Sequence, residues 1–225
     1  LFGWYRGVTT YRQSTIEAVL SGDLYELPAG QVGTAVGVQY QQDELNDTPG
    51  EQTLLGNLWG SSSSGITAGD QSTRAVFSEF QIPVLADMFL VKSLDVTLSG
   101  RWTDVNTYGS DTTYKAGIKW DIAAGFRVRA SRGSSFRSPA LFELYLGNQS
   151  GFLGQNVADP CLNWSGKEAD GTIDDRVLAN CKAAGIPASY TSAGSSATTY
   201  TSGGAGRLKA ETSVAETVGL VWTSE

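Results

Sequence analysis

Residues Arg129–Tyr145 read RASRGSSFRSPALFELY, and they decide how the rest of the chain is interpreted. Between 126 and 131, apolar residues alternate with arginine and serine, which is the period-two pattern of a strand whose two faces meet different surroundings. The Gly-Ser-Ser sequence at 133–135 breaks this alternation. Ser-Pro at 138–139 then opens a short helix near 139–145, since proline is well tolerated at the first helical position. A strand that ends in a small helix indicates the rim of a sheet.

The same alternation recurs along the chain and predicts an all-β protein. Between 94 and 104, for example, leucine, valine and tryptophan alternate with polar residues. No helical crossover separates the predicted strands, so they form an antiparallel meander. The long segments 42–71 and 132–211 are expected to be loops. Seven strands are expected, at 14–27, 31–41, 72–82, 94–104, 112–121, 126–131 and 212–223.

The alternation leaves two architectures open. The polar face is either the wet interior of a transmembrane barrel or the solvent face of a sandwich sheet. Aromatic residues near strand ends suit a membrane-interface girdle, and equally suit ordinary strands. Bacterial single-chain barrels have even strand numbers, so seven strands leave two open edges through which the chain is expected to self-associate.

Composition narrows the function. The chain has 225 residues, 16 Lys and Arg, 23 Asp and Glu, a net charge of −7 and no histidine. An acidic balance argues against nucleic acid as a partner, and the lack of histidine removes His-based triads and the commonest zinc ligands. The acidic run at 170–175 does not have EF-hand spacing. We therefore predict no catalytic residues, no metal and no cofactor.

Two motifs carry a resemblance to a known family. SSFRSPALFEL at 134–144 resembles the FRAPSLxEL element of TonB-dependent outer-membrane receptors, where a late barrel strand enters a large extracellular loop. GRLKAETSVAETVGLVW at 206–222 resembles the NPxLKPExSxxxxxGL element that leads into the next strand. Ala210 stands where the family usually has proline. The strands between 74 and 120 also resemble barrel strands of the family.

The resemblance implies a bacterial outer-membrane protein that binds and imports a scarce nutrient such as an iron chelate, cobalamin or an oligosaccharide. Residues 1–225 would form part of one larger transmembrane β-barrel domain, with extracellular loops and outer-membrane lipid around it. No plug-like region or TonB box is recognised in the sequence. We therefore expect a fragment of such a receptor, in which the TonB complex acts through the missing plug.

Candidate ligand contacts come from two groups of side chains. The basic group would attract an anionic ligand, or would pair with Glu143, Glu211 and carboxylates of the polar face. The aromatic group would stack on a sugar or an aromatic siderophore, or would pack inside the loop. The basic residues are Arg127, Arg129, Arg132, Arg137 and Arg207, and the aromatic ones are Trp164 and Tyr190.

The two cysteines, Cys161 and Cys181, lie in the longest loop. An even count in an exported protein suggests a disulfide, and the polar surroundings offer little cover for two free buried thiols. Closing a loop of about twenty residues is worth roughly 3 kcal/mol in the chain-entropy model.

A second function remains open from the residues alone, namely a soluble secreted β-sandwich that binds carbohydrate. An enzyme is not expected, because a glycosidase would need two facing carboxylates that the sequence does not pair.

Overall fold

The computed structural model describes residues 4–58, 63–123, 125–191 and 196–223, and these form two compact units. The sheet unit comprises residues 9–47, 67–145 and 203–225, and the loop unit comprises residues 1–8, 48–66 and 146–202. The expected single barrel domain stays a prediction.

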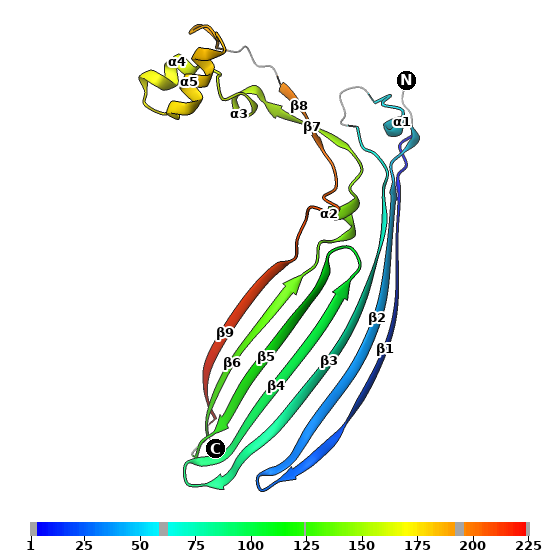
Figure 1. Ribbon diagram of the computed structural model, residues 1–225, viewed down its shortest axis with the longest axis vertical. Coiled ribbons are helices and arrows are strands. Elements are labelled where there is room, and N and C mark those ends of the chain that lie inside the picture. The colour runs from blue at the N-terminus through cyan, green and yellow to red at the C-terminus, as the bar shows by residue number, and fades with distance from the viewer. Residues whose placement is uncertain (1–3, 59–62, 124, 192–195, 224–225) are drawn as a thin grey trace. The chain divides into compact units, whose positions relative to one another are not determined.

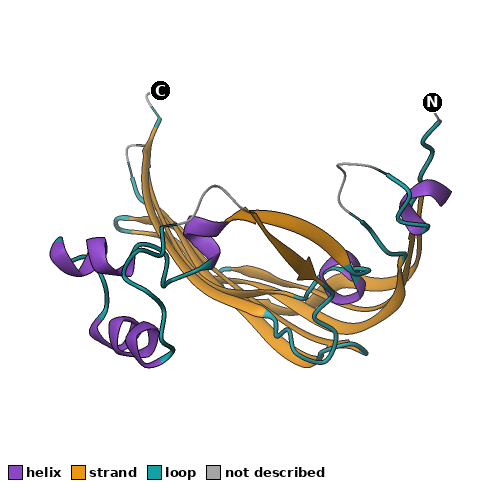
Figure 2. Cartoon of the chain, turned by 90° about the horizontal axis from the view of Figure 1, so that it is seen from above, coloured by secondary structure: helices purple, strands orange, loops and turns teal. Residues whose placement is uncertain are grey.

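The sheet unit is one antiparallel sheet of seven described strands in the order β1-β2-β3-β4-β5-β6-β9. The strands form one curved layer (Figures 1 and 2), and β9 pairs with β6 although a long segment separates them in sequence. This confirms the predicted all-β meander of about seven strands, and the sheet stays open between β1 and β9 within the described residues. The strands are β1 Val8–Leu27, β2 Gly30–Thr48, β3 Thr67–Met88, β4 Val91–Val105, β5 Gly109–Asp121, β6 Phe126–Arg137 and β9 Glu211–Trp222.

Most strands are longer than the alternation predicted. One correction is in β6, which does not end at 131 but runs to Arg137, because residues 133–137 pair with residues 211–215 of β9. Likewise β3 continues beyond Pro83 after a register shift. The alternating pattern shows only where the side chains of the two faces differ. A strand continues wherever its backbone finds hydrogen-bonding partners on a neighbouring strand, whatever its side chains are. The expected loops at 42–71 and 132–211 therefore shrink to the connections 49–66 and 138–210.

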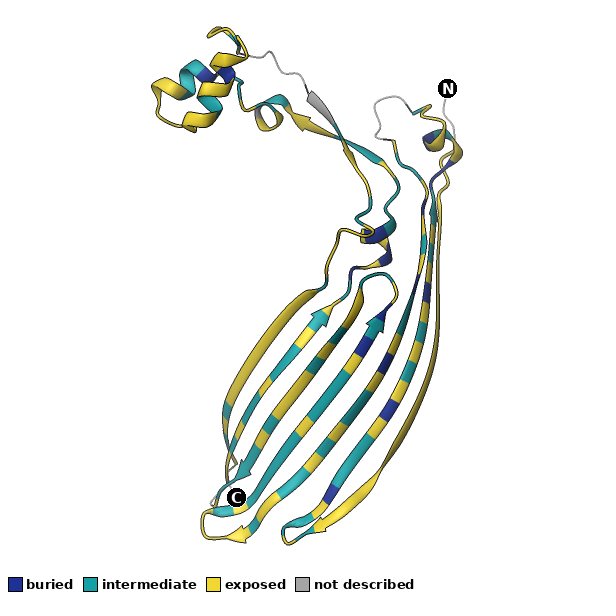
Figure 3. Ribbon diagram, viewed as in Figure 1, coloured by how far each residue is buried: buried dark blue, intermediate teal, exposed yellow. Residues whose placement is uncertain are grey.

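The two faces of the sheet differ in chemistry, as the alternation predicted. The polar face carries glutamine, threonine, serine, lysine and arginine, for example Gln39, Thr97 and Lys115. Less exposed residues lie between exposed ones along parts of β2, β3 and β4 (Figure 3). The apolar face is exposed, and its side chains include Val36, Val38, Val76, Leu98, Trp102, Tyr114, Ile118, Val214, Val218, Leu220 and Trp222. Such a face requires an apolar surrounding, because exposing this much apolar surface to water is unfavourable in free energy.

A short helix, α2 (Leu141–Tyr145), follows β6 and rests on β3. It confirms the predicted helix, although it begins at Leu141 rather than 139. The Glu143 carboxylate accepts the Ala140 N–H at 2.7 Å and so caps the helix start. The Tyr145 ring lies directly over Gly69, where any Cβ would come within 2.2 Å of the ring. Glycine at this position lets the helix approach the strand closely.

The loop unit contains structure that the sequence did not predict. It has α1 (Glu51–Leu54), a hairpin of β7 (Gln149–Gly154) and β8 (Ser196–Thr201), and the helices α3 (Gln155–Ala158), α4 (Trp164–Ala169) and α5 (Asp175–Ala183). These elements are too short to produce a clear periodicity. None of the helices in the part of the chain that the structure describes is long and apolar enough to cross a membrane.

Candidate functional site

Three side chains at the end of the sheet join the two sequence motifs, and we call them the Arg137 clasp. Arg137 Nη1 donates to Glu143 Oε2 at 2.9 Å, and Arg137 Nη2 donates to Glu211 Oε1 at 2.9 Å. Arg137 Nε also donates to Glu211 Oε2 at 3.1 Å. Arg137 ends β6, Glu143 lies in α2 and Glu211 opens β9. The planar guanidinium suits this double pairing, since it presents its donors in a fixed fork.

The clasp is reinforced by the backbone that returns to the sheet. Gly204 N–H donates to the Glu143 carbonyl at 2.9 Å, and Ala205 N–H donates to the Leu144 carbonyl at 3.1 Å. Hydrogen bonds from Arg137, followed by the one from the Ala140 N–H, lower the pKa of the Glu143 carboxyl. Glu143 therefore stays charged, and one arginine links β6, α2 and β9.

The structure does not bring the five candidate arginines together into one cluster. Arg137 follows the pairing interpretation, with Glu143 and Glu211 as its partners. Arg207 Nη2 donates to the Gly203 carbonyl at 3.1 Å. Arg127 and Arg132 also form ion pairs, so four of the five have partners within the chain.

Arg132 lies on the opposite face from Arg127 and Arg129. It pairs in register with Glu216 on the apolar face, and its Nη1 lies 3.0 Å from Glu216 Oε1. This placement follows from the extension of β6, because in a continuous strand an even-numbered residue faces away from 127 and 129. Arg132 thus lies apart from the polar face on which a lumenal ligand would lie.

Arg127 and Arg129 do lie together on the polar face. Arg127 forms an ion pair with Asp121. Lys119 lies between two carboxylates, with Nζ 3.3 Å from Asp95 Oδ2 and 3.2 Å from Asp121 Oδ2. Arg129 pairs in register with Lys119, and it makes no ion pair within the described residues. Arg127 therefore follows the interpretation in which the basic group pairs with carboxylates of the polar face, and its partner Asp121 comes from the neighbouring strand β5.

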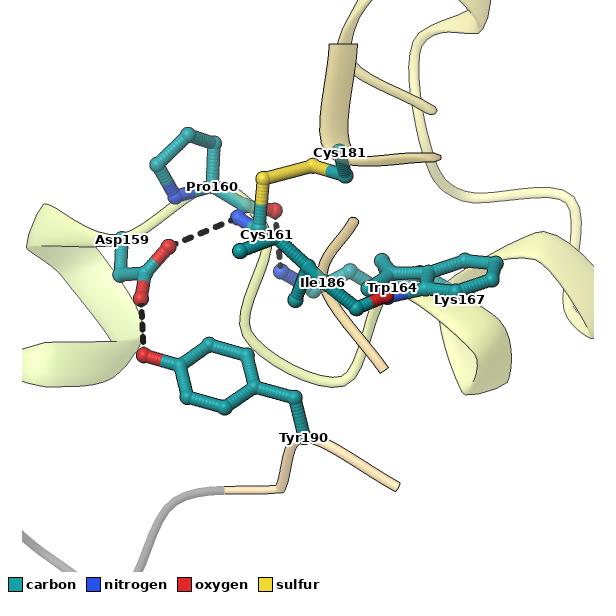
Figure 4. Close-up of a disulfide and its surroundings, with 8 residues drawn as sticks. All are labelled: Asp159, Pro160, Cys161, Trp164, Lys167, Cys181, Ile186 and Tyr190. Carbon is teal, nitrogen blue, oxygen red and sulfur yellow. Dashed lines mark hydrogen bonds between the residues drawn. A yellow bond between two sulfur atoms is a disulfide. The ribbon is translucent and has the colours of Figure 1, made fainter. Parts of the chain in front are cut away.

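The disulfide predicted between Cys161 and Cys181 is present and ties α5 to the segment before α4 (Figure 4). Trp164 packs beside it with only 9% of its surface exposed. The Trp164 Nε1 donates to the Ile186 carbonyl at 3.1 Å, and Lys182 Nζ lies 5.3 Å from the ring centroid. Trp164 therefore follows the second interpretation, packing inside the loop.

Tyr190 is also held inside this unit. Its hydroxyl donates to Asp159 Oδ2 at 2.6 Å and accepts from Gln155 Nε2 at 2.8 Å (Figure 4 shows the first contact). The Tyr190 hydrogen bond, aided by the Cys161 N–H, lowers the pKa of Asp159. The same bond raises the pKa of Tyr190. Among the described residues, no group of three or more His, Cys, Asp or Glu side chains is placed to hold a metal ion.

The family is decided by a comparison that spans nearly the whole chain. Residues 2–225 match the family model described as "TonB dependent receptor-like, beta-barrel". The chain belongs to this family. Its members are outer-membrane receptors and transporters of bacteria rather than enzymes, and they take part in nutrient import.

The seven-stranded antiparallel sheet of the sheet unit agrees with membership in the TonB-dependent receptors. The family match and the single layer of the seven-stranded sheet favour the barrel over the sandwich interpretation. No solved structure matches the chain.

Proposed function

We propose that this chain forms wall strands and loops of a receptor in the bacterial outer membrane that binds a scarce nutrient and imports it. The TonB complex would drive import through a plug region of the intact protein. The nutrient is an iron chelate, cobalamin or an oligosaccharide. Import consists of binding and gated passage, with no bond chemistry by this chain.

The observation that carries this proposal is the contrast between the two faces of the sheet. The apolar face is widely exposed, and Val218 retains 79% of its surface. The polar face carries ion pairs and hydroxyl groups along the same strands. The apolar face matches lipid and the polar face matches water, as in the walls of outer-membrane barrels.

The Arg137 clasp supports an anchoring role for the two motifs. It connects the end of β6 with the start of β9, and the whole long connection 138–210 leaves from and returns to this point. Nutrient contacts in this segment would therefore be presented from a fixed base. Among the seven residues predicted to touch the ligand, Arg129 is the one whose charged group has no partner within the described residues.

Growth under nutrient limitation tests the proposal. A strain lacking the receptor gene would be grown with a single source of iron, cobalamin or carbon, chosen in turn from siderophores, cobalamin and oligosaccharides. We expect the deletion to abolish growth on at least one source, and the gene returned on a plasmid to restore it. Normal growth of the deletion strain on every source, with full-length receptor shown to be present in the wild type, would refute import.

A further inference from the structure

The polar face contains a groove that includes one of the predicted ligand contacts, Arg129. It has a volume of about 420 Å³ and lies across β4, β5, β6 and β9. Its floor is a row of small side chains that are paired strand to strand, namely Thr97 with Gly117, Gly117 with Ser131, and Ser131 with Thr217. Gly219 widens the floor on one side, and a Cβ there would meet no atom within 4 Å.

Three cations border this row. Lys115 and Lys119 stand two residues before and two residues after Gly117 on β5, and Arg129 lies opposite Lys119 on β6. Four residues of strand separate the two lysines by about 13 Å. All three side chains line the groove, so a group lying over the glycine has positive charge at both ends.

Two of these cations have no counter-charge within the part of the chain that the structure describes. Lys119 is neutralised by Asp95 and Asp121. Lys115 and Arg129 form no ion pair within the described residues, and the residues that line the groove include no acidic side chain. The chain as a whole carries a net charge of −7, so this concentration of positive charge is local.

We propose that the groove over Gly117 binds an anionic group that carries carboxylate or phosphate oxygens. Arg129 offers a bidentate fork and Lys115 a mobile point charge, while the hydroxyls of Thr97, Ser131 and Thr217 supply further donors. The small floor lets such a group approach the sheet closely. This inference rests on the proposed function, because there the polar face is the inner wall of the barrel. The anion belongs either to the imported nutrient or to an acidic side chain of the receptor's own plug.

Citrate is a suitable probe, because it carries three carboxylates. Its binding to the purified full-length receptor in detergent would be measured by calorimetry, with maltose as a neutral probe. For a nutrient site we expect citrate but not maltose to bind. The double variant Lys115→Gln/Arg129→Gln should weaken citrate binding about tenfold or more, as expected when charge-assisted hydrogen bonds are lost. The control Lys92→Gln removes one exposed charge outside the groove and should leave binding unchanged.

A variant that fills the groove without changing any charge tests whether citrate binds in the groove itself or is attracted only by the positive charge around it. A Cβ at Gly117 would meet its neighbours at 3.8–3.9 Å, which is ordinary contact, so a larger side chain is accommodated at its base. Gly117→Leu keeps every cation but fills the groove, and it should also abolish citrate binding.

The second source of the anion gives a different result. If a plug carboxylate occupies the groove, citrate will not bind the wild type, and the double variant will lower the melting temperature of the receptor. That difference should fade as the salt concentration rises from about 0.1 M to 1 M, because salt screens the pairing. If citrate does not bind and the melting temperature is unchanged, the inference is overturned. Failure of import itself is seen separately, as normal growth of the deletion strain on all sources.

Discussion

The ion pair between Arg132 and Glu216 provides a sharp test of which face of the sheet meets lipid. The pair lies on the apolar face, with the two side chains 62% and 65% exposed. In the proposed receptor this exposure is to hydrocarbon. Changing Glu216 to leucine should therefore leave a charged arginine among lipid tails.

The depth of the pair follows from its position in β9. Glu216 precedes Trp222, a candidate girdle residue at the strand end, by six residues, or about 20 Å along the strand. With a tilt of about 40°, this is roughly 15 Å along the membrane normal, near the middle of an apolar band about 25 Å tall. An unpaired arginine at that depth costs about 2–4 kcal/mol.

A double-mutant cycle measures this cost. Glu216→Leu should destabilise the full-length receptor by about 2–4 kcal/mol, and Arg132→Leu by less, because a lone glutamate costs less at this depth than an arginine. The double leucine variant should be close to wild type or more stable, since well-packed apolar residues often replace an ion pair without loss. The assay is guanidinium unfolding in phospholipid vesicles, followed by tryptophan fluorescence. A change below about 0.5 kcal/mol for Glu216→Leu, as expected of a pair in water, would refute the assignment of this face to lipid.

Four further predictions concern the loop unit and the clasp. Replacing Cys161 and Cys181 by alanine should destabilise the loop unit by about 3 kcal/mol, seen as faster proteolysis between 155 and 191 with the strands still protected. The pKa of Asp159 is lowered in the folded loop unit, so its charged carboxylate stabilises the folded state above the unfolded pKa of about 3.9, and this stabilisation is lost as pH falls through the folded pKa. Tryptophan fluorescence should therefore report loosening of the loop unit in acid. Asp159→Asn should remove this pH dependence. The pKa of Tyr190 is raised in the folded state, so its protonated hydroxyl stabilises the loop unit below the unfolded pKa of about 10, and this stabilisation is lost as pH rises through the folded pKa. Tyr190→Phe should abolish this pH dependence. Arg137→Gln should speed amide exchange in α2, and Arg137→Lys should not restore protection, since lysine lacks the fork; equal exchange in all three proteins would contradict the clasp.

The strands themselves could largely be read from the sequence, but their ends could not. The alternation around 94–104 identifies β4, yet nothing in the composition of residues 133–137 shows that they pair with β9. The short helices of the loop unit were missed for a related reason. The disulfide ties α5 to the segment before α4, and Trp164 of α4 donates to the Ile186 carbonyl; both are contacts between segments rather than local patterns.

The candidate contacts were grouped in the sequence by their distance along the chain, which is a poor guide in a sheet. Arg129 and Arg132 are three residues apart but lie on opposite faces, because the strand continues through both. Lys115 was not among the candidates, although it is the cation that, with Arg129, borders the groove. Only the register between β5 and β6 places them around the same glycine.

The sequence by itself determined the all-β class, the two motifs and the pairing of the two cysteines, because each is a property of local periodicity, residue identity or the lack of another partner. The tertiary structure decided which charges meet. Arg137 reaches a glutamate 6 residues away and another 74 residues away, and Lys119 reaches Asp95 across 24 residues. Cross-strand hydrogen bonding sets these contacts, and a shift of one residue in register would turn every side chain of a strand to the other face.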